Sequence, residues 1–183
     1  VMAGNYGFGR MMVNAGKSNS CGIEASLRGS ALDDHLSWGL NYGYTRAVFK
    51  EYTDSISGDD GMTAVDYKDK RVPFVPEHTL AANADYRIDF GGTLKSVTLG
   101  ANISMRGKTY WDNANLYAQD VYAVLGAHAD ADFGPVTVSL WGRNLTDAKY
   151  NTFATDSRMA GTLKYFAQQG NPLQVGLDLR LHF

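Results

Sequence analysis

The final segment of the chain alternates strictly between apolar side chains and polar or small ones. From 173 to 183 every odd-numbered position is apolar, and the set comprises Leu173, Val175, Leu177, Leu179, Leu181 and Phe183. Successive side chains of a β-strand point to opposite faces of a sheet, whereas an α-helix would scatter this set around its axis. The pattern therefore predicts a β-strand with one apolar and one polar face.

The same alternation recurs upstream, at 21–28, 36–45, 79–90, 97–106, 121–133 and 136–140. Most of these segments run to about ten residues, whereas strands of globular proteins have about 5–6. The register of the apolar residues leaves two arrangements open near the start. We favour one unbroken strand from Met11 to Gly29, which gives seven strands in all. If the chain instead turns at 16–19, there are eight.

The connections between these segments alternate in length. The short ones are 29–34, 91–92 and 134–135, and the long ones are about 50–75, 108–119 and 149–171. Such alternation, with long strands, is typical of transmembrane β-barrels, in which the apolar face meets lipid and the polar face lines the lumen. We therefore predict an all-β fold, an antiparallel transmembrane β-barrel segment. Its turns would be short on the periplasmic side and its loops long on the extracellular side.

This arrangement explains a composition that otherwise suggests an ordinary soluble protein. Mean hydropathy is −0.28 because every second residue of a strand is polar, and no stretch approaches the 18 or so apolar residues of a membrane helix. The net charge of −2 gives no indication of nucleic-acid binding. The single cysteine excludes an internal disulfide.

Aromatic residues are frequent, with 11 Tyr, 8 Phe and 3 Trp, and many lie near the ends of the predicted strands. Amphipathic rings favour the membrane–water interface, so girdles are expected there. The alternative is the core of a soluble β-sandwich, which requires neither such long strands nor such unequal connections. A last strand that ends on Phe183 also resembles the assembly signal of bacterial outer-membrane proteins, to which Val175, Leu177, Leu179 and Leu181 would belong.

Three segments carry a resemblance to a known family. On the penultimate strand its pattern Asn-Leu-(Thr/Phe)-Asp-x-x-Tyr is matched by Asn144, Leu145, Thr146, Asp147 and Tyr150. Gly170-Asn171-Pro172 leads into the last strand, although the family usually has Arg where this chain has Leu173. The segment 71–80, where an external loop re-enters a strand, is the third match, and 14–17 with 22–24 is a weaker fourth. The chain thus resembles the C-terminal part of a TonB-dependent outer-membrane receptor.

The resemblance implies a fold, a place and a set of partners. Residues 1–183 would form a C-terminal portion of a barrel of about 22 strands, with no second domain, and the plug and energy-coupling box would precede residue 1. The implied partners are outer-membrane lipid, the plug and remaining strands, TonB through that N-terminal part, and the barrel-assembly machinery. The implied function is uptake of a bulky nutrient, such as an iron chelate, cobalamin, an oligosaccharide or a peptide, in a Gram-negative bacterium.

Two predicted external loops combine flat rings with amides. In the first, the candidates for ligand contact are Tyr110, Trp111, Asn113, Asn115 and Tyr117; in the last, they are Phe153, Tyr165 and Phe166. Rings can cover apolar faces of a sugar or macrocycle while amides bind its hydroxyl groups. The alternative is that the rings anchor the protein at the interface and the loops are simply polar.

One group of titratable residues shares the predicted lumen face. His128, Asp130 and Asp132 are spaced two apart, so their side chains would point the same way on a strand. Zinc sites need three or four converging ligands, and a solvated wall is the favoured interpretation. We therefore expect no catalytic residue, metal or cofactor. The alternatives are a complete eight-stranded barrel with a structural or adhesive role and, third, an outer-membrane hydrolase.

Overall fold

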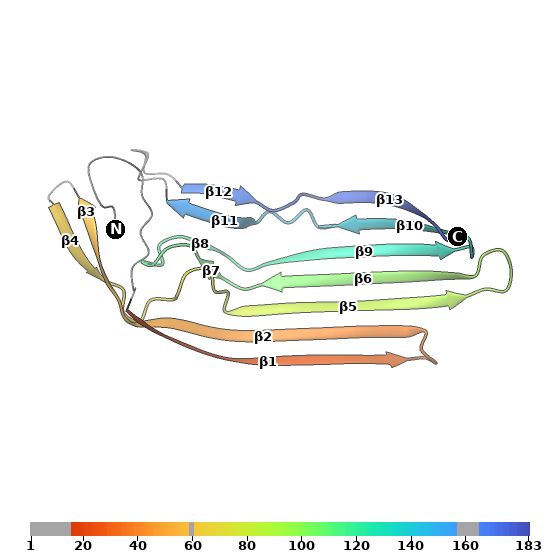
Figure 1. Ribbon diagram of the computed structural model, residues 1–183, viewed down its shortest axis with the longest axis horizontal. Coiled ribbons are helices and arrows are strands. Elements are labelled where there is room, and N and C mark those ends of the chain that lie inside the picture. Colours follow the sequence, from red (N-terminus) through yellow and green to blue (C-terminus); the bar gives the residue numbers. More distant parts are fainter. Residues whose placement is uncertain (1–15, 59–60, 157–164) are drawn as a thin grey trace.

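Seven long strands form one antiparallel sheet (Figure 1). The computed structural model describes residues 16–58, 61–156 and 165–183. In order across the sheet, the strands are β1 (Lys17–Ala31), β2 (Leu36–Glu51), β5 (His78–Asp89), β6 (Ser96–Arg106), β9 (Tyr122–Asp132), β10 (Val136–Arg143) and β13 (Gln174–Leu181). Among these residues the sheet is open, because β1 and β13 each pair with one long strand. The same residues contain no helix that is long and apolar enough to cross a membrane.

The prediction of an all-β, seven-stranded antiparallel sheet is confirmed. Lys17, Ser18 and Asn19 belong to β1 and pair with Glu51, Phe49 and Val48 of β2, so the alternative turn at 16–19 is wrong. The expected start of this strand at Met11 lies outside the described residues. The eight-stranded arrangement therefore has no support in the main sheet.

Three two-stranded ribbons lie within the long connections at one end of the sheet (Figure 1). They are β3 (Thr53–Gly58) with β4 (Gly61–Asp66), β7 (Thr109–Tyr110) with β8 (Ala118–Gln119), and β11 (Asn151–Asp156) with β12 (Tyr165–Gln169). The short turns 32–35, 90–95 and 133–135 lie at the opposite end. Short and long connections therefore separate to the two ends, as the sequence predicts.

The register of the strands gathers the apolar residues on one face. Leu27 pairs with Leu40 and Leu40 with Ala82, and the row continues through Ile103 to Leu125. A slip of one residue would turn every side chain of a strand to the other face, so the pattern fixes the register. The alternation seen in each segment thus describes one continuous surface.

This apolar face is uncovered. Ile23 is 70% exposed, Val175 71% and Leu177 68%. Among the described residues the buried apolar side chains are few, namely Ala47, Val48, Phe49, Tyr67 and Ala154. A soluble β-sandwich would bury such a face against a second sheet about 10 Å away, and the described residues form one layer. An apolar surface of this extent requires an apolar environment or a partner.

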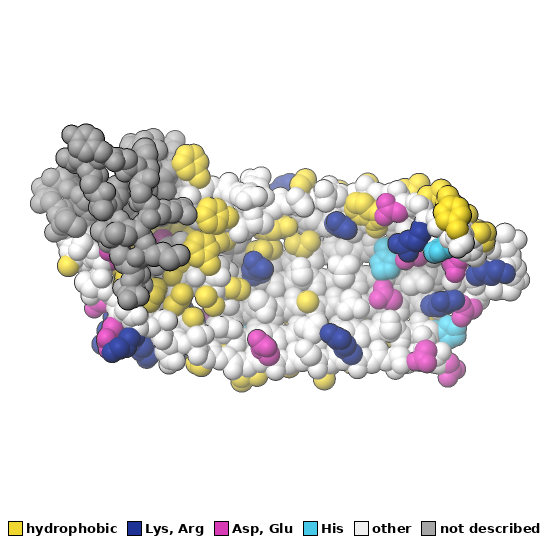
Figure 2. All heavy atoms as spheres, in the orientation of Figure 1, with side chains coloured by type: hydrophobic (Ala, Val, Ile, Leu, Met, Phe, Trp, Pro, Cys, Tyr) yellow, Lys and Arg dark blue, Asp and Glu magenta, His cyan; other side chains and the backbone are white. Residues whose placement is uncertain are grey.

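The opposite face is polar. One row runs through Glu24, Gly43, Thr79, Arg106 and Tyr122, which pair successively across five strands. In the view of Figure 2, charged side chains are scattered over the long strands, and hydrophobic side chains gather towards the end that carries the ribbons. The two faces therefore differ in chemistry over their whole length.

Two glycines allow large side chains to lie flat on the polar face. Trp141, where the apolar pattern breaks, lies on this face; its Nε1 donates to Asp178 Oδ2 at 2.9 Å. A Cβ on its cross-strand partner Gly176 would come 2.3 Å from the Trp141 ring. A Cβ on Gly100 would come 2.0 Å from Cε1 of its partner His128. Glycine is required where another group approaches the backbone so closely.

Candidate functional site

A hollow of about 470 Å³ lies on the polar face, next to the end that carries the ribbons. Its lining includes small residues, among them Gly43, Ala81 and Ser104, and the charged residues Glu24 and Arg106. The side chains of Glu24 and Arg106 form no hydrogen bond or ion pair among the described residues. Small-molecule sites have volumes of about 300–1,000 Å³. The hollow is therefore large enough for part of a ligand and offers it one charge of each sign.

A stacked pair of tyrosines also lines this hollow. The rings of Tyr122 and Tyr150 have centroids 4.3 Å apart and lie 11° from parallel. The Tyr150 ring packs directly on Gly170, where a Cβ would come 2.1 Å from the ring. The last residue of the matched motif thus contributes to the wall of the hollow.

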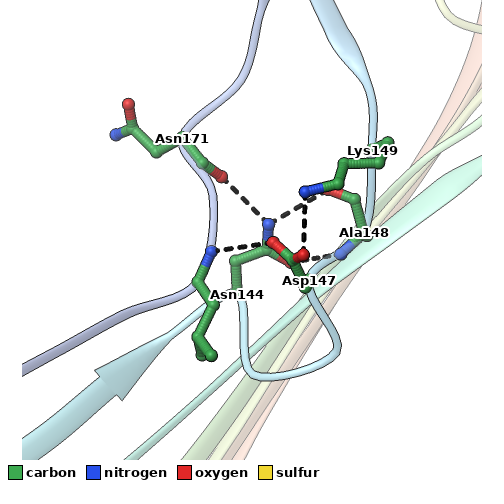
Figure 3. A network of polar contacts seen from close by, with 6 residues as sticks. Asn144, Asp147, Ala148, Lys149 and Asn171 are labelled. Carbon is green, nitrogen blue, oxygen red and sulfur yellow. Dashed lines mark hydrogen bonds and ion pairs between the residues drawn. The ribbon is translucent and has the colours of Figure 1, made fainter.

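The start of the same motif is a structural turn (Figure 3). Asn144 is 2% exposed; its Nδ2 donates to the carbonyl oxygens of Ala148 at 3.0 Å and Asn171 at 2.9 Å, and its Oδ1 accepts from the Ala148 N–H at 2.9 Å. Asp147 accepts from the Leu173 N–H at 3.1 Å. Asn144 and Asp147 both have positive φ, which these residue types adopt readily. The turn therefore fastens the start of the β11–β12 ribbon to the segment that precedes β13.

The remaining motif residues have separate places. The Leu145 N–H donates to the carbonyl oxygen of Leu125 at 2.9 Å, and its side chain lies over Gly142. Thr146 is exposed. Lys149 forms an ion pair with Asp147 at 2.7 Å. These contacts position the chain, and none of them presents a group to the hollow.

The connection from Tyr110 to Tyr117 is a tight hairpin held by Asp112. The Asp112 carboxylate accepts from the backbone N–H groups of Leu116 at 3.2 Å and Tyr117 at 2.9 Å. The Trp111 N–H donates to the Tyr117 carbonyl oxygen at 2.9 Å. Tyr110 lies beneath the ammonium of Lys108, which is 5.4 Å from the ring centroid.

The two asparagines of this hairpin bind other parts of the chain. Asn115 Oδ1 accepts from the Arg71 N–H at 2.7 Å, and its Nδ2 donates to the Arg71 carbonyl oxygen at 2.9 Å. Asn113 Nδ2 donates to the hydroxyl of Tyr52 at 3.2 Å. The expected contact of both amides with a ligand stays a prediction, since in this structure they join the hairpin to the preceding connection.

Three rings from three different connections form a cluster that we call the aromatic trio: Phe74, Trp111 and Phe153. Phe74 meets Trp111 edge to face at 5.6 Å and stacks on Phe153 at 5.9 Å, 9° from parallel. Phe74 has a φ of 65°, which is uncommon for a bulky residue. The residue is also 52% exposed. Sequence reasoning missed Phe74, although it lies between Pro73 and Pro76 in the third matched segment.

The last connection contributes further exposed apolar surface. Phe166 is 64% exposed and pairs with Thr155, while Tyr165 begins β12 with its backbone opposite Asp156. Tyr117 of the hairpin is also exposed. The candidates from the two loops thus lie at the same end of the sheet.

The predicted His128, Asp130 and Asp132 do not converge as one group. His128 Nε2 lies 3.5 Å from Asp130 Oδ2 and 3.5 Å from Oδ1 of Asp85, which lies on β5 in the same cross-strand row. Asp132 instead accepts from the Gly134 N–H at 2.7 Å in the short turn. Among the described residues no group of three His, Cys, Asp or Glu side chains is arranged to hold a metal ion.

Tyr52 connects the hairpin to the base of the β3–β4 ribbon. Its ring contacts Phe49 at 4.9 Å and Tyr67 at 5.2 Å, and its hydroxyl donates to Asp54 at 3.3 Å. Burial raises the pKa of Tyr52 above its usual value, and the charge of Asp54 adds to the increase. The hydroxyl of Tyr52 therefore stays protonated at pH values at which an exposed tyrosine begins to ionise.

Similarities to known proteins cover most of the chain. Residues 2–145 match the model of a family described as TonB dependent receptor-like, beta-barrel. The ferrioxamine receptor of Yersinia enterocolitica is 34% identical over 145 residues, which cover 75% of this chain and 18% of that receptor. The ferric yersiniabactin uptake receptor FyuA from Yersinia pestis has a TM-score of 0.76 and 24% identity, covering 93% of this chain and 24% of that one.

The siderophore receptor PiuA from Acinetobacter baumannii has a similar fold, with a TM-score of 0.70 and 22% identity. The match covers 88% of this chain and 21% of PiuA. The chain thus spans between 18% and 24% of the length of these three proteins.

Proposed function

The chain belongs to the family of TonB-dependent receptor-like β-barrels, and from this premise we propose that it contributes wall strands and outer loops to a receptor for a ferric chelate. The receptor lies in the outer membrane of a Gram-negative bacterium and takes up its cargo with energy supplied through TonB. Residues 1–183 are a C-terminal portion of its barrel, and a plug and further strands complete it.

The two faces of the sheet support this proposal most directly. The apolar face is uncovered over all seven strands, which suits contact with lipid, whereas the polar face carries the hollow and suits the lumen. The long connections then face outwards with the aromatic trio, and the short turns face the periplasm. On β13, Val175, Leu177, Leu179 and Leu181 lie exposed with Phe183 beyond them, which suits recognition by the barrel-assembly machinery.

The relatives favour an iron chelate over the other nutrients. The curated relative is named for ferrioxamine, one solved structure is named as a ferric yersiniabactin uptake receptor, and the other is named as a siderophore receptor. Cobalamin, an oligosaccharide or a peptide has no such support. The family consists of receptors rather than enzymes, and the group around His128 is not assembled as the hydrolase alternative requires.

We propose that cargo is captured between the aromatic trio and the hollow. Tyr110, Tyr117, Tyr165 and Phe166 would extend the apolar contact, and Arg106 would meet an anionic oxygen of the chelate. A desolvated stacking contact contributes about 0.5–1.5 kcal/mol beyond the area it buries. Several such rings would therefore provide much of the affinity for an apolar organic ligand.

Uptake of radioactive iron in iron-starved cells tests the function. Cells that express the receptor and cells from which its gene is deleted are given ⁵⁵Fe as a ferric trihydroxamate, and vitamin B12 is the control cargo. We expect saturable uptake that is lost on deletion of the receptor gene while B12 transport is unchanged. Deletion of TonB should abolish the iron uptake as well. Unchanged uptake of every ferric hydroxamate and catecholate, together with lost B12 transport, would overturn the proposal.

A further inference from the structure

The three long connections are bonded to one another, and the hairpin Tyr110–Tyr117 with its base is the element that links them. The first connection, between β2 and β5, contributes Tyr52, Arg71 and Phe74; the third, between β10 and β13, contributes Asn151 and Phe153. Tyr52, Arg71 and Phe74 form hydrogen bonds with the hairpin. Asn151 forms one with Gln119 at its base, and Phe153 stacks on Phe74 within the trio. The contacts with each neighbouring connection are of different kinds.

Contact with the first connection is by hydrogen bonds that resemble a strand ladder. The Asn115 amide satisfies both the N–H and the C=O of Arg71, at 2.7 and 2.9 Å, as a backbone partner in a sheet would. The Phe74 N–H donates to the Tyr110 carbonyl oxygen at 2.8 Å. Asn113 adds the bond to Tyr52 at the base of the β3–β4 ribbon. The first connection is therefore fastened to the hairpin at three residues, Tyr52, Arg71 and Phe74.

Contact with the third connection depends on Gln119, at the base of the hairpin in β8. Gln119 Oε1 accepts from the Asn151 N–H at 2.8 Å, where β11 begins. Two residues further along, Phe153 stacks on Phe74. This side-chain hydrogen bond therefore joins the base of the hairpin to the strand that carries Phe153.

The hairpin is also closed by hydrogen bonds of its own. Asp112 closes it with two backbone hydrogen bonds, and Asn115 Nδ2 also donates to the Asp112 carbonyl oxygen at 3.2 Å. Asn115 has a φ of 58°, so its amide is aimed at Arg71 by a left-handed backbone. The side chain of Asn115 thus takes part both in the hydrogen bonds that close the hairpin and in those that hold Arg71 of the first connection.

We propose that Asn115 and Gln119 are positioning residues that make the three outer connections move as one unit. Contact of cargo with the aromatic trio is then transmitted through the hairpin to the β3–β4 and β11–β12 ribbons. The part that concerns cargo rests on the proposed function, but the coupling itself exists in the empty receptor.

Hydrogen–deuterium exchange of the folded receptor in detergent micelles tests the coupling without cargo. Asn115→Gly removes the amide and keeps a residue that accepts a positive φ. Loss of its bonds to Arg71 is expected to speed exchange about tenfold in 110–117, in 53–58 and in 151–156. Faster exchange confined to 110–117 would overturn the proposal.

A second variant separates positioning from general loss of structure. Gln119→Ala removes the acceptor for Asn151, whereas Gln119→Glu keeps an oxygen there; the matched control is Gln174→Ala, an exposed side chain on β13. We expect faster exchange at 151–156 in Gln119→Ala, restoration in Gln119→Glu and no change in Gln174→Ala. Equal exchange in all three variants would contradict the role of Gln119, and this arm still decides if Asn115→Gly fails to fold.

Addition of a ferric trihydroxamate then tests transmission. In the unchanged receptor we expect all three segments to become protected together, and in Asn115→Gly we expect β3 and β4 to lose that protection. If the receptor binds no ferric chelate, the proposed function fails while the coupling measured in the empty receptor is unaffected. If cargo protects the three segments equally in both proteins, the positioning role of Asn115 is refuted.

Discussion

Replacement of Asn144 by glycine should destabilise the barrel more than replacement of any exposed polar residue in the same turn. Asn144 is 2% exposed, and its amide makes the hydrogen bonds to both backbone groups of Ala148 and to the carbonyl of Asn171. A net hydrogen bond contributes about 1 kcal/mol, and a buried group left unpaired costs about 1–3 kcal/mol. With three backbone groups affected, Asn144→Gly should lose about 3 kcal/mol.

Alanine at the same position separates the hydrogen bonds from the backbone conformation. Asn144 has a φ of 49°, which glycine adopts without strain and alanine does not. A left-handed conformation costs about 1–2 kcal/mol for a residue with a Cβ. Asn144→Ala should therefore be about 1 kcal/mol less stable than Asn144→Gly.

Asn171 provides a matched control in the same network. Its carbonyl oxygen accepts the bond from Asn144, and its side chain is directed away from the turn (Figure 3). Asn171→Ala should thus change stability by less than about 0.5 kcal/mol, as at an ordinary surface site. Urea unfolding of the receptor reconstituted in lipid vesicles, followed by tryptophan fluorescence, measures all three variants. The reasoning is refuted if Asn144→Gly costs less than about 1 kcal/mol, or if Asn171→Ala costs as much.

Three further predictions concern the two faces and the outer end of the sheet. Leu177→Arg should cost about 2–4 kcal/mol, because it places a charge on the apolar face, whereas Ser139→Arg on the polar face of β10 should be tolerated; folding yield in vesicles compares them. Phe153→Ala should raise the Kd for a ferric trihydroxamate about tenfold, which fluorescence titration measures, and an unchanged Kd would exclude the trio from the binding site. The raised pKa of Tyr52 stabilises the fold fully below the ordinary value of 10.0 and loses this contribution as the pH rises towards the folded-state value. After division by the intrinsic, base-catalysed rate, exchange at 53–58 should therefore quicken above pH 10, and less so in Tyr52→Phe; identical pH profiles would count against this cause.

The strands and their two faces were predictable because their information is local. Side chains two positions apart in a strand lie on the same face of the sheet. The segment 173–183 therefore specifies both β13 and its orientation without knowledge of its partner strand. Trp141 shows where this fails. It breaks the apolar pattern because Asp178 and Gly176 on another strand provide its hydrogen bond and its space.

The outer end of the sheet was predictable only in part because its contacts are distant in the chain. Arg71 and Asn115 are separated by 44 positions, and no periodicity relates them. The ring-rich hairpin was predicted from its composition, but the hydrogen bonds of its amides to the first connection were not. Phe74 was missed because its ring belongs to a cluster formed by three connections. Asp132 was grouped with His128 by spacing alone, whereas in the structure its carboxylate accepts a hydrogen bond from the Gly134 N–H of the short turn.

In the proposed receptor, the glycines beneath Trp141 and His128 affect the width of the barrel lumen. The diameter of a barrel grows with the number of its strands, yet the free bore also depends on whether interior side chains stand upright or lie along the wall. Where a ring lies over a glycine of the next strand, the wall keeps its polar groups and the free diameter of the lumen is reduced only a little. Receptors with the same number of strands can therefore admit cargoes of different girth by exchanging a few such glycines.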